Sequence, residues 1–275
     1  MLEKNELQKH ARNVRRNILT MIAEANSGHP GGSLSAVEIG TWLYFNEMNI
    51  TSDNIASNKR DRFVLSKGHA SPLLYAILAE KGFIKEEELL QFRQLGSALQ
   101  GHPSKKHLVG VDMSTGSLGQ GISTAVGMAL ANKIDQNPYR VFVLLGDGES
   151  EEGQVWEAAM AAAHYQLDNL VVIIDANGLQ IDGYCREVMN PYPLDEKFRA
   201  FGWNVNDIDG HDYDEIESAL SNAKECKGKP TVIIAKTIKG KGVSFMENEA
   251  SWHGSAPNKE QLEQALTELE ESANG

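Results

Sequence analysis

Two polar segments of this chain combine residue types that bind hard metal ions. Asp147 stands between two glycines, directly after the apolar run Val141–Leu145. Asn177 follows the next apolar run, Leu170–Ile174, and lies 30 residues beyond Asp147, about the length of one strand–helix–strand unit. A right-handed crossover would bring both loops to the same edge of a sheet. A carboxylate, an amide oxygen and a backbone carbonyl would then surround one point. Such oxygens suit Mg²⁺ or Ca²⁺ and leave room for phosphate and water.

Four histidines stand beside glycine or proline in loop-like segments: His29, His69, His102 and His253. An imidazole titrates near neutral pH, so these side chains suit proton movement among hydroxyl and carbonyl oxygens. Zinc binding is a weaker alternative, because none of the four has the close His/His or Cys/His spacing of zinc sites. We therefore expect a proton-transfer site built on loops. The remaining histidines, His10, His107, His164 and His211, lack this repeated context.

Short apolar runs predict the strands that must position these loops. The runs do not alternate with polar residues, so both faces of the sheet should be covered. Strand alternating with helix predicts the α/β class, as a doubly wound parallel sheet with helices on both faces. Ligands bind such sheets at the carboxyl ends of the strands, so the loops after the strands form the candidate site. The predicted strands are Phe63–Leu65, Val141–Leu145, Leu170–Ile174 and Thr231–Ala235, with helices predicted over 119–133, 153–165 and 212–224.

Helices are also predicted near both ends of the chain. Residues 5–25 carry apolar side chains at spacings of three and four, and the breaker-rich segment 26–32 follows. Near the other end, Asn258 is a good N-cap that can form a capping box with Gln261. No linker separates a second domain, so we expect one domain over 1–275, with residues 272–275 frayed.

Composition excludes several classes of function. The 275 residues carry a formal charge of −12, and binding to nucleic acid or an anionic membrane would need a basic footprint instead. Cys185 and Cys226 form no CxxC pair, which excludes a disulfide framework or a cysteine zinc site as the organising feature. No apolar run approaches the ~20 residues of a membrane span, and the charged N-terminus lacks the apolar core of a signal peptide. We expect a cytoplasmic protein.

The spacing from the GDG segment around Asp147 to Asn177 resembles the signature of thiamine diphosphate-binding enzymes. The resemblance implies that Asp147, Asn177 and the backbone carbonyl of Leu179 hold a metal, and that the metal holds the diphosphate. The implied metal is Mg²⁺, with Ca²⁺ or Mn²⁺ as alternatives. Gly148 would give the diphosphate close access to the backbone. Two apolar side chains would pack on the rings of the cofactor, those of Leu118 and Ile181.

Seven segments narrow the resemblance to the transketolases, because they occur in that family's order between residues 25 and 254: ANSGHPGG, LSKGHASPLLYA, GHP, TGSLGQGIS, GDGESEEGQVWEA, DANGLQIDG and WHG. The resemblance implies transfer of a two-carbon ketol unit from a ketose, or ketose phosphate, to an aldose. Catalytic roles would fall to His29, His69, His102 and His253, which would line the donor-sugar channel. The residues implied to bind the cofactor are His69, Gly116, Ser117, Leu118, Gly148, Glu152, Asn177, Ile181 and His253, with Ser117 replacing a frequent proline.

Charged side chains near these segments allow more than one interpretation. The lysines of the segment 237–242 (TIKGKG) either attract anionic sugar phosphates, face the diphosphate, or are solvated loop cations. Glu149 and Glu151 are expected to be exposed to solvent. Glu152 matches a carboxylate that lies at the subunit interface in the transketolases.

A complete transketolase continues into a pyrimidine-binding domain and a C-terminal domain, and neither follows here. The resemblance therefore implies the N-terminal subunit of a split transketolase, active only with a C-terminal partner subunit. The chain begins with Met and ends in a loose tail, so we expect a whole gene product. Because each site would be built between chains, we expect two copies of each subunit, an α2β2 heterotetramer. The surface that meets the partner should include Glu152 and the Ala-rich face of the following helix.

Three other functions fit parts of the sequence. An α-subunit of a 2-oxo-acid dehydrogenase also binds thiamine diphosphate, but SGHPGG and the four histidines argue against it. A chain like deoxyxylulose-phosphate synthase would normally carry all of its domains. A non-catalytic binding subunit would have no reason to keep Asp147, Asn177 and the histidines. The sequence does not distinguish among donor and acceptor sugars, phosphorylated or not.

Overall fold

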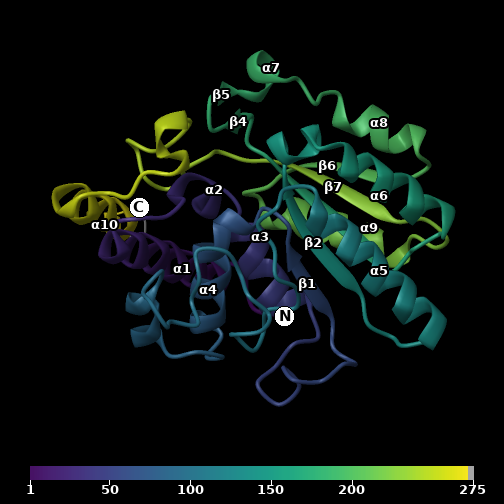
Figure 1. Cartoon of the computed structure of the whole chain (residues 1–275), viewed down its shortest axis with the longest axis horizontal. Helices are drawn as coiled ribbons and strands as arrows, with labels where there is room; N and C mark the ends of the chain where they lie inside the picture. The colour runs from purple at the N-terminus through teal and green to yellow at the C-terminus, as the bar shows by residue number, and fades with distance from the viewer. Residues whose placement is uncertain (272–275) are drawn as a thin grey trace.

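A five-stranded parallel sheet forms the centre of the fold in the computed structural model, which describes residues 1–271 (Figure 1). The strand order is β1-β2-β3-β7-β6, and every neighbouring pair runs parallel. A small antiparallel hairpin, β4 paired with β5, lies beyond the carboxyl end of the sheet. The strands are β1 (Arg62–Leu65), β2 (Val141–Gly146), β3 (Leu170–Ala176), β4 (Leu179–Gln180), β5 (Gly183–Tyr184), β6 (Asn204–Asp209) and β7 (Thr231–Lys236).

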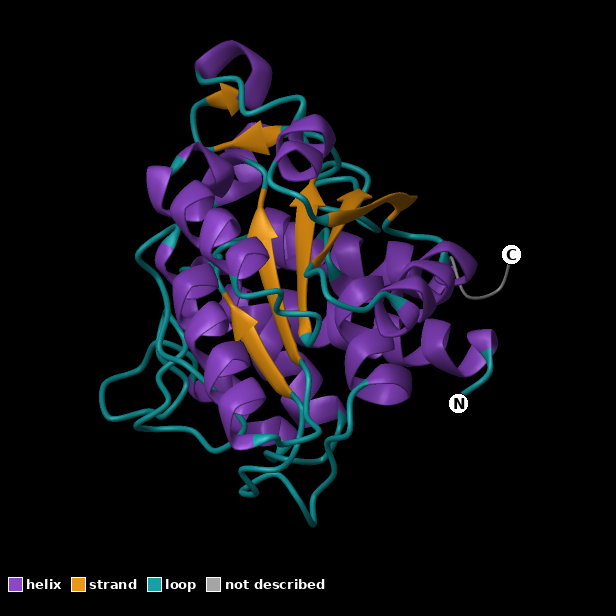
Figure 2. Ribbon diagram, turned by 90° about the vertical axis from the view of Figure 1, so that its right-hand side faces the viewer, coloured by secondary structure: helices purple, strands orange, loops and turns teal. Residues whose placement is uncertain are grey.

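Helices cover both faces of the sheet, as Figure 2 shows from the side. Helices α5, α6 and α8 pack on one face, and α1, α3, α4 and α9 pack on the other. The helices are α1 (Lys4–Ala25), α2 (Pro30–Leu34), α3 (Val37–Trp42), α4 (Ser71–Glu80), α5 (Gln120–Asp135), α6 (Gly153–His164), α7 (Cys185–Val188), α8 (Leu194–Ala200), α9 (Tyr213–Glu225) and α10 (Lys259–Glu271).

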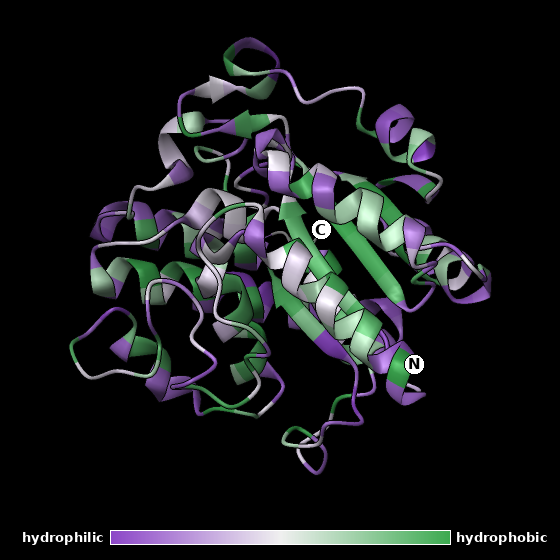
Figure 3. Ribbon diagram, turned by 45° about the vertical axis from the view of Figure 1, so that its right-hand side comes forward, coloured by the Kyte–Doolittle hydropathy of each residue, from purple (hydrophilic) through white to green (hydrophobic). Residues whose placement is uncertain are grey.

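The central strands supply side chains to two separate cores. In β2, Val141, Val143 and Leu145 enter the core with α5 and α6, whereas Phe142 and Leu144 enter the core with α1 and α4. Strands β2, β3 and β7 accordingly contain unbroken apolar runs, and the central ribbons of Figure 3 are green. A sheet buried on both faces needs this continuous apolar pattern, and its presence explains why the strands form unbroken apolar runs in the sequence.

The α/β class and the doubly wound parallel sheet predicted from the sequence are confirmed, and each of the four predicted strands lies within the observed one. Strand β6 was not predicted, because its sequence NVNDID is polar and lies half-exposed at an edge of the sheet.

The predicted capping box is present: the Asn258 amide donates to Gln261 Oε1 at 3.0 Å, and the Gln261 amide donates to Asn258 Oδ1 at 2.8 Å. Residues 272–275, predicted to be frayed, lie outside the described residues. Within residues 1–271, no helix is both long and apolar enough to cross a membrane.

Candidate functional site

A cavity of about 280 Å³ opens at the carboxyl edge of the sheet. The loops that follow β1, β2, β3 and β7 all contribute side chains to it, because parallel strands end at the same edge of the sheet. The remaining walls come from the start of α2, the segment before α5 and the turn Ala250–His253. The lining residues are His29, Gly32, Lys67, His69, Gly116, Leu118, Gly146, Asp147, Gly148, Glu149, Asn177, Leu179, Gln180, Ile181, Lys239 and His253.

Asp147 joins two of the loops that form the cavity. Its side chain is buried, and Oδ1 accepts a hydrogen bond from the Gly148 amide at 2.9 Å. The other oxygen, Oδ2, accepts from the Gly178 amide and from the Tyr192 hydroxyl, both at 2.7 Å. Burial raises the pKa of Asp147, although these hydrogen bonds partly counteract the rise. The carboxylate is therefore held in one orientation at a place where a cation would offset its desolvation.

Asn177 and Leu179 add two further oxygens beside Asp147. The Asn177 amide nitrogen donates to Asp175 Oδ2 at 3.1 Å, which fixes its orientation, and Oδ1 accepts from the Leu179 amide at 3.1 Å. The Leu179 carbonyl accepts from Lys239 Nζ at 2.9 Å. Carboxylate, amide and carbonyl oxygens are the donors that Mg²⁺ and Ca²⁺ prefer, so the three residues predicted to bind a metal fit one chemically.

This oxygen set contains a single carboxylate. Within residues 1–271, no group of three or more His, Cys, Asp or Glu side chains is placed to hold a metal ion. A cation bound beside Asp147 would therefore need further ligands from water or from an anionic molecule in the cavity. A diphosphate supplies such oxygens, because Mg²⁺ in proteins is usually held by one or two carboxylates together with phosphates and waters.

Three of the four predicted histidines, His29, His69 and His253, line the cavity and form a triangle. The ring centroids of His29 and His69 are 5.2 Å apart, those of His69 and His253 are 5.2 Å apart, and those of His29 and His253 are 5.5 Å apart. Burial and neighbouring cations lower the pKa of His29 to about 4 and that of His253 to about 3, and the pKa of His69 is also lowered well below its usual value. All three imidazoles are therefore neutral at pH 7, and each keeps one nitrogen that can accept a proton.

The two ring nitrogens of these histidines are not equivalent. Lys239 Nζ lies 2.9 Å from His253 Nδ1, and an ammonium can only donate, so neutral His253 carries its own proton on Nε2. Among residues 1–271, the buried Nδ1 of His29 has no hydrogen-bond partner. A buried polar nitrogen without a partner is costly to the fold. Since this nitrogen is shielded, a molecule in the cavity would have to meet another atom of the His29 ring.

His102 lies slightly apart from the triangle. It is exposed, and a side chain at Gly116 would collide with it, since a Cβ there would stand 2.8 Å from His102 Cδ2. Burial and the charge of Arg93 lower the pKa of His102. Gly116 and Leu118 line the cavity, whereas Ser117, Glu152 and His102 are not among the lining residues just given. The structure therefore brings most of the predicted site residues together and leaves these three at its border.

Two buried lysines form the floor of the cavity, and neither was assigned a firm role from the sequence. Lys239, in the segment 237–242, is 2% exposed, so the interpretation as a solvated loop cation is wrong for this residue. Burial lowers the pKa of Lys239 to about 8. Lys67 is equally buried, and its Nζ lies 2.5 Å from Asp175 Oδ2. Buried cations around a polar cavity favour an anionic ligand.

The acidic run after Gly148 differs from its prediction. Glu149 was expected to be exposed but is buried, because Oε1 accepts from Ser66 Oγ at 2.5 Å and from the Gly119 amide at 2.9 Å. Glu151 is only partly exposed, and it accepts from Gln180 Nε2 at 2.7 Å. Glu152 is exposed, and its Cβ would stand 2.7 Å from a side chain at Gly119. Glu149 thus ties the loops around the cavity together, which a charge run in a sequence does not reveal.

The Ala-rich face of α6 was expected to form the partner interface. Ala158, Ala159 and Ala162 are instead buried in this chain's own core, where their small size allows α6 to pack closely on the sheet and on α5. This part of the prediction is wrong. The spacing that suggested a free apolar face is the spacing by which α6 covers its own sheet.

The comparisons with known proteins agree with the fold. The family model described as "Transketolase, thiamine diphosphate binding domain" matches residues 7–271. The chain is 48% identical to a 6-deoxy-6-sulfo-D-fructose transketolase subunit of Clostridium sp. (strain MSTE9), over 96% of each chain. It is 43% identical to an apulose-4-phosphate transketolase subunit of Phocaeicola vulgatus, over 96% of this chain and 94% of that relative.

Longer relatives match over only part of their length. Human transketolase is 45% identical over 96% of this chain, but the match covers 42% of the human protein. The crystal structure of transketolase from Campylobacter jejuni superimposes with a TM-score of 0.91 at 37% identity, covering 100% of this chain and 43% of that one. The chain thus spans less than half of these longer relatives and nearly all of the two subunit-length relatives.

Proposed function

Because the chain belongs to the transketolase family, as its thiamine diphosphate-binding domain, we propose that it is the N-terminal subunit of a two-chain transketolase and forms one domain. The observation that carries the proposal is the cavity, which is lined both by Asp147, Asn177 and Leu179 and by three neutral histidines. The match to subunit-length relatives supports the two-chain arrangement. The reaction would be transfer of a two-carbon ketol unit from a ketose to an aldose.

We assign the diphosphate end of the cofactor to the oxygen-rich side of the cavity. Asp147, Asn177 and the Leu179 carbonyl would hold Mg²⁺, or Ca²⁺ or Mn²⁺ in its place, and the metal would hold the diphosphate. The Gly148 amide and the two buried lysines at the floor would offset the remaining negative charge. The apolar side chains that line the cavity, Leu118 and Ile181, would contact the rings of thiamine diphosphate.

The histidines would manage protons on the sugar. Bound thiamine diphosphate supplies an electron sink for the two-carbon unit, so the protein has to orient the sugar and move protons. His29, which lines the cavity as a neutral imidazole, could take a proton from a donor-sugar hydroxyl and return it to the acceptor. His253, protonated on Nε2, can donate to a substrate or diphosphate oxygen. His69 and the border residue His102 would complete the channel.

A partner subunit would close the open side of the cavity. Ile181 lines the cavity and is 65% exposed. The residues that follow it in β5, in α7 and just after α7 carry three more exposed apolar side chains, those of Tyr184, Val188 and Met189. We propose that this surface, the hairpin patch, contacts the C-terminal transketolase subunit that carries the pyrimidine-binding domain. Continuity with the cavity favours this assignment, because a molecule bound there would be shared by both chains. Glu152 would lie near the same boundary, and the assembly would be α2β2.

The donor would be a ketose with an anionic end. The relatives of subunit length are named for a sulfonated fructose and for apulose 4-phosphate. These names motivate testing sugar phosphates and sugar sulfonates as donors. A place in pentose phosphate or related sugar metabolism in the cytoplasm remains a prediction.

The experiment that tests the metal and cofactor assignment uses calorimetry of the chain together with its partner. Asp147→Ala and Asn177→Ala should each weaken binding of Mg²⁺–thiamine diphosphate, because each removes an oxygen ligand. Asp53→Ala, which removes an exposed carboxylate that does not line the cavity, is the matched control and should bind as the wild type does. Wild-type affinity in either cavity variant would show that the metal site is wrongly assigned.

The reaction itself is tested with the reconstituted pair. Ketol transfer from fructose 6-phosphate or 6-deoxy-6-sulfofructose to an aldose phosphate is the expected result. Release of CO₂ from pyruvate in place of ketol transfer would indicate a 2-oxo-acid enzyme instead. Full ketol-transfer activity from the purified chain without a second polypeptide would refute the two-chain assignment.

A further inference from the structure

The segment 237–242 carries Lys239 from the end of β7 into the cavity. Lys239 Nζ donates to the Leu179 carbonyl at 2.9 Å and lies 2.9 Å from His253 Nδ1. It therefore connects the oxygen assigned to the metal with one of the histidines. The position of this one ammonium sets the electrostatics on both walls of the site, so what holds the segment in place matters.

Two side chains outside the cavity hold this segment on either side of Lys239. The Ile238 amide donates to His211 Nε2 at 2.9 Å, and Arg15 Nε donates to the Lys241 carbonyl at 2.9 Å. His211 comes from the loop between β6 and α9, and Arg15 comes from α1. The backbone is thus fixed at the residue before Lys239 and again two residues after it.

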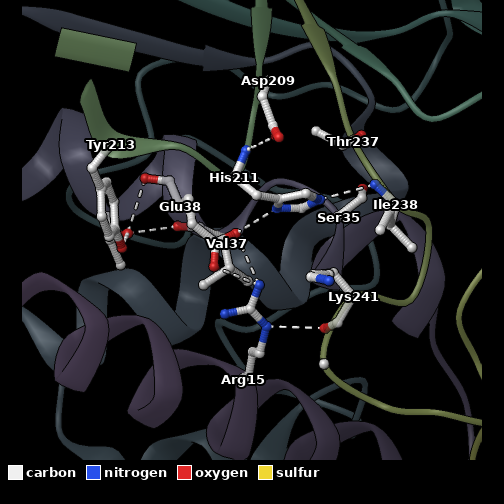
Figure 4. Close-up of polar contacts among 12 residues, drawn as sticks. Arg15, Ser35, Val37, Glu38, Asp209, His211, Tyr213, Thr237, Ile238 and Lys241 are labelled. Carbon is white, nitrogen blue, oxygen red and sulfur yellow. Dashed lines mark hydrogen bonds and ion pairs between the residues drawn. The ribbon is translucent and has the colours of Figure 1, made fainter. Parts of the chain in front are cut away.

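Glu38 of α3 joins the two anchors to each other (Figure 4). Arg15 lies 2.7 Å from Glu38 Oε1, and His211 Nδ1 lies 2.9 Å from Glu38 Oε2. Because His211 Nε2 accepts a hydrogen bond from the Ile238 amide, neutral His211 carries its proton on Nδ1. Nδ1 then donates a hydrogen bond to Glu38 Oε2. One carboxylate thereby orients the guanidinium and selects the tautomer of the imidazole. We call Arg15, Glu38 and His211 the clamp.

The clamp is fixed more firmly than a set of surface contacts would be. The side chains of Arg15 and Glu38 are 8% and 12% exposed, so their charges interact with little screening by water. The segment itself leaves little room for drift, since Gly240 has a φ of +78° and donates its amide to the Gly31 carbonyl at 3.0 Å. A loop held at so many points can present a lysine at one position.

We propose that Arg15, Glu38 and His211 are positioning residues that set Lys239 Nζ in the cavity, and through it the affinity of the site for the metal–diphosphate. The inference rests on the proposed function, because it names the ligand that Lys239 meets. None of the three clamp residues lines the cavity. They would act only through the segment that they hold.

Two substitutions of His211 separate the anchor on the segment from the contact with Glu38. In His211→Gln the amide oxygen can reach the position of Nε2 and accept from the Ile238 amide. In His211→Asn the shorter amide lies near the position of Nδ1, so it can donate to Glu38 but not reach Ile238. His164→Asn, at the exposed end of α6, is the matched control. We expect about tenfold weaker Mg²⁺–thiamine diphosphate binding in His211→Asn, from the loss of one hydrogen bond, and recovery in His211→Gln.

Cleavage by trypsin provides a readout that needs no cofactor. The segment contains Lys239 and Lys241, and its release should speed cleavage after them about tenfold in His211→Asn but not in His211→Gln or the control. Equal cleavage rates in His211→Asn and the wild type would overturn the clamp. If wild-type protein failed to bind thiamine diphosphate at all, the proposed function would fail while this assay still decided the clamp.

A double substitution tests whether His211 acts through Lys239. In a Lys239→Ala background, His211→Asn should cause no further loss of cofactor affinity. A second tenfold loss, or a loss in His211→Asn that His211→Gln does not restore, would show that the histidine supports the fold in general, and the proposal would be wrong. If His211→Asn fails to fold, Arg15→Lys takes its place, because lysine loses the forked guanidinium contact. Arg15→Lys should then weaken cofactor binding while His211→Gln does not, and equal affinities of the two variants would overturn the proposal.

Discussion

Replacing Glu38 by glutamine should change how stability depends on pH, because this carboxylate is the charged centre of the clamp. Burial alone would raise the pKa of Glu38, but the Arg15 guanidinium and the hydrogen bond from His211 outweigh it and lower that pKa to about 2. A carboxyl group whose pKa is lower in the folded state stabilises the fold only while it is ionised. Glutamine has the same shape but cannot ionise.

The size and sign of the effect follow from these pKa values. An exposed glutamate titrates near 4.5, so its stabilisation is complete above pH 4.5 and is lost as the pH falls toward 2. The ionised Glu38 side chain contributes about 3 kcal/mol to the unfolding free energy near pH 5.5 and about 2 kcal/mol at pH 3.5. The difference in unfolding free energy between wild type and Glu38→Gln should therefore shrink by about 1 kcal/mol over this interval.

Urea denaturation at pH 5.5, 4.5 and 3.5 measures that difference directly. Glu157→Gln, exposed on α6, is the control and should follow the wild type at each pH. A wild-type minus Glu38→Gln difference that stayed constant over the series would refute the reasoning, because it would mean that the carboxylate gains nothing from Arg15 and His211. A variant as stable as the wild type at pH 5.5 would refute it as well.

Three further predictions concern catalysis, backbone and assembly. Alanine in place of His69, His102 or His253 should lower turnover of the reconstituted enzyme and leave its melting temperature unchanged. The loss should be about 10²–10⁴-fold where the residue acts as a general acid or base. Normal activity per folded protein together with a sharply lower melting temperature would make these residues structural. Gly240→Ala should lower the urea unfolding free energy by about 1–3 kcal/mol, because φ is +78° and the new Cβ would stand 2.4 Å from the Met246 carbonyl oxygen; a smaller loss would contradict this. In analytical ultracentrifugation, the isolated chain should self-associate and the mixture with the partner should sediment as two copies of each chain, whereas a one-to-one complex would exclude α2β2.

The sheet could be predicted from sequence to the extent that its strands are buried. The runs at β1, β2, β3 and β7 are apolar because both faces of the sheet are covered, and this pattern is local. Strand β6 carries no such pattern, since it is an edge strand with β7 as its one strand neighbour and most of its residues are at least partly exposed. The hairpin β4–β5 could not be predicted either, because two-residue strands are too short to show an alternation of apolar and polar residues.

The site residues can be sorted in the same way, into those that stand in local sequence motifs and those that depend on distant partners. Asp147, Asn177 and the histidines stand in short motifs with glycine, and the sequence alone places them in loops at the sheet edge. Lys67 and Glu149 were missed because burying a charge requires partners that are far away in the chain: Asp175 for the lysine, and Ser66 with the Gly119 amide for the glutamate. His211 also follows a glycine, Gly210, but it lies in none of the seven family-like segments. Its importance is visible only in the fold, where Glu38 and the Ile238 amide lie on its two nitrogens.

The polar edge strand β6 has a consequence for a chain that exposes an apolar hairpin patch. An exposed sheet edge can recruit a strand from another copy and start ordered aggregation, and edge charges are a common protection. Asp207 and Asp209 are both exposed on β6, so a second copy paired there would bring carboxylates together. The chain can thus expose its apolar hairpin patch while this edge of the sheet resists pairing with a second copy.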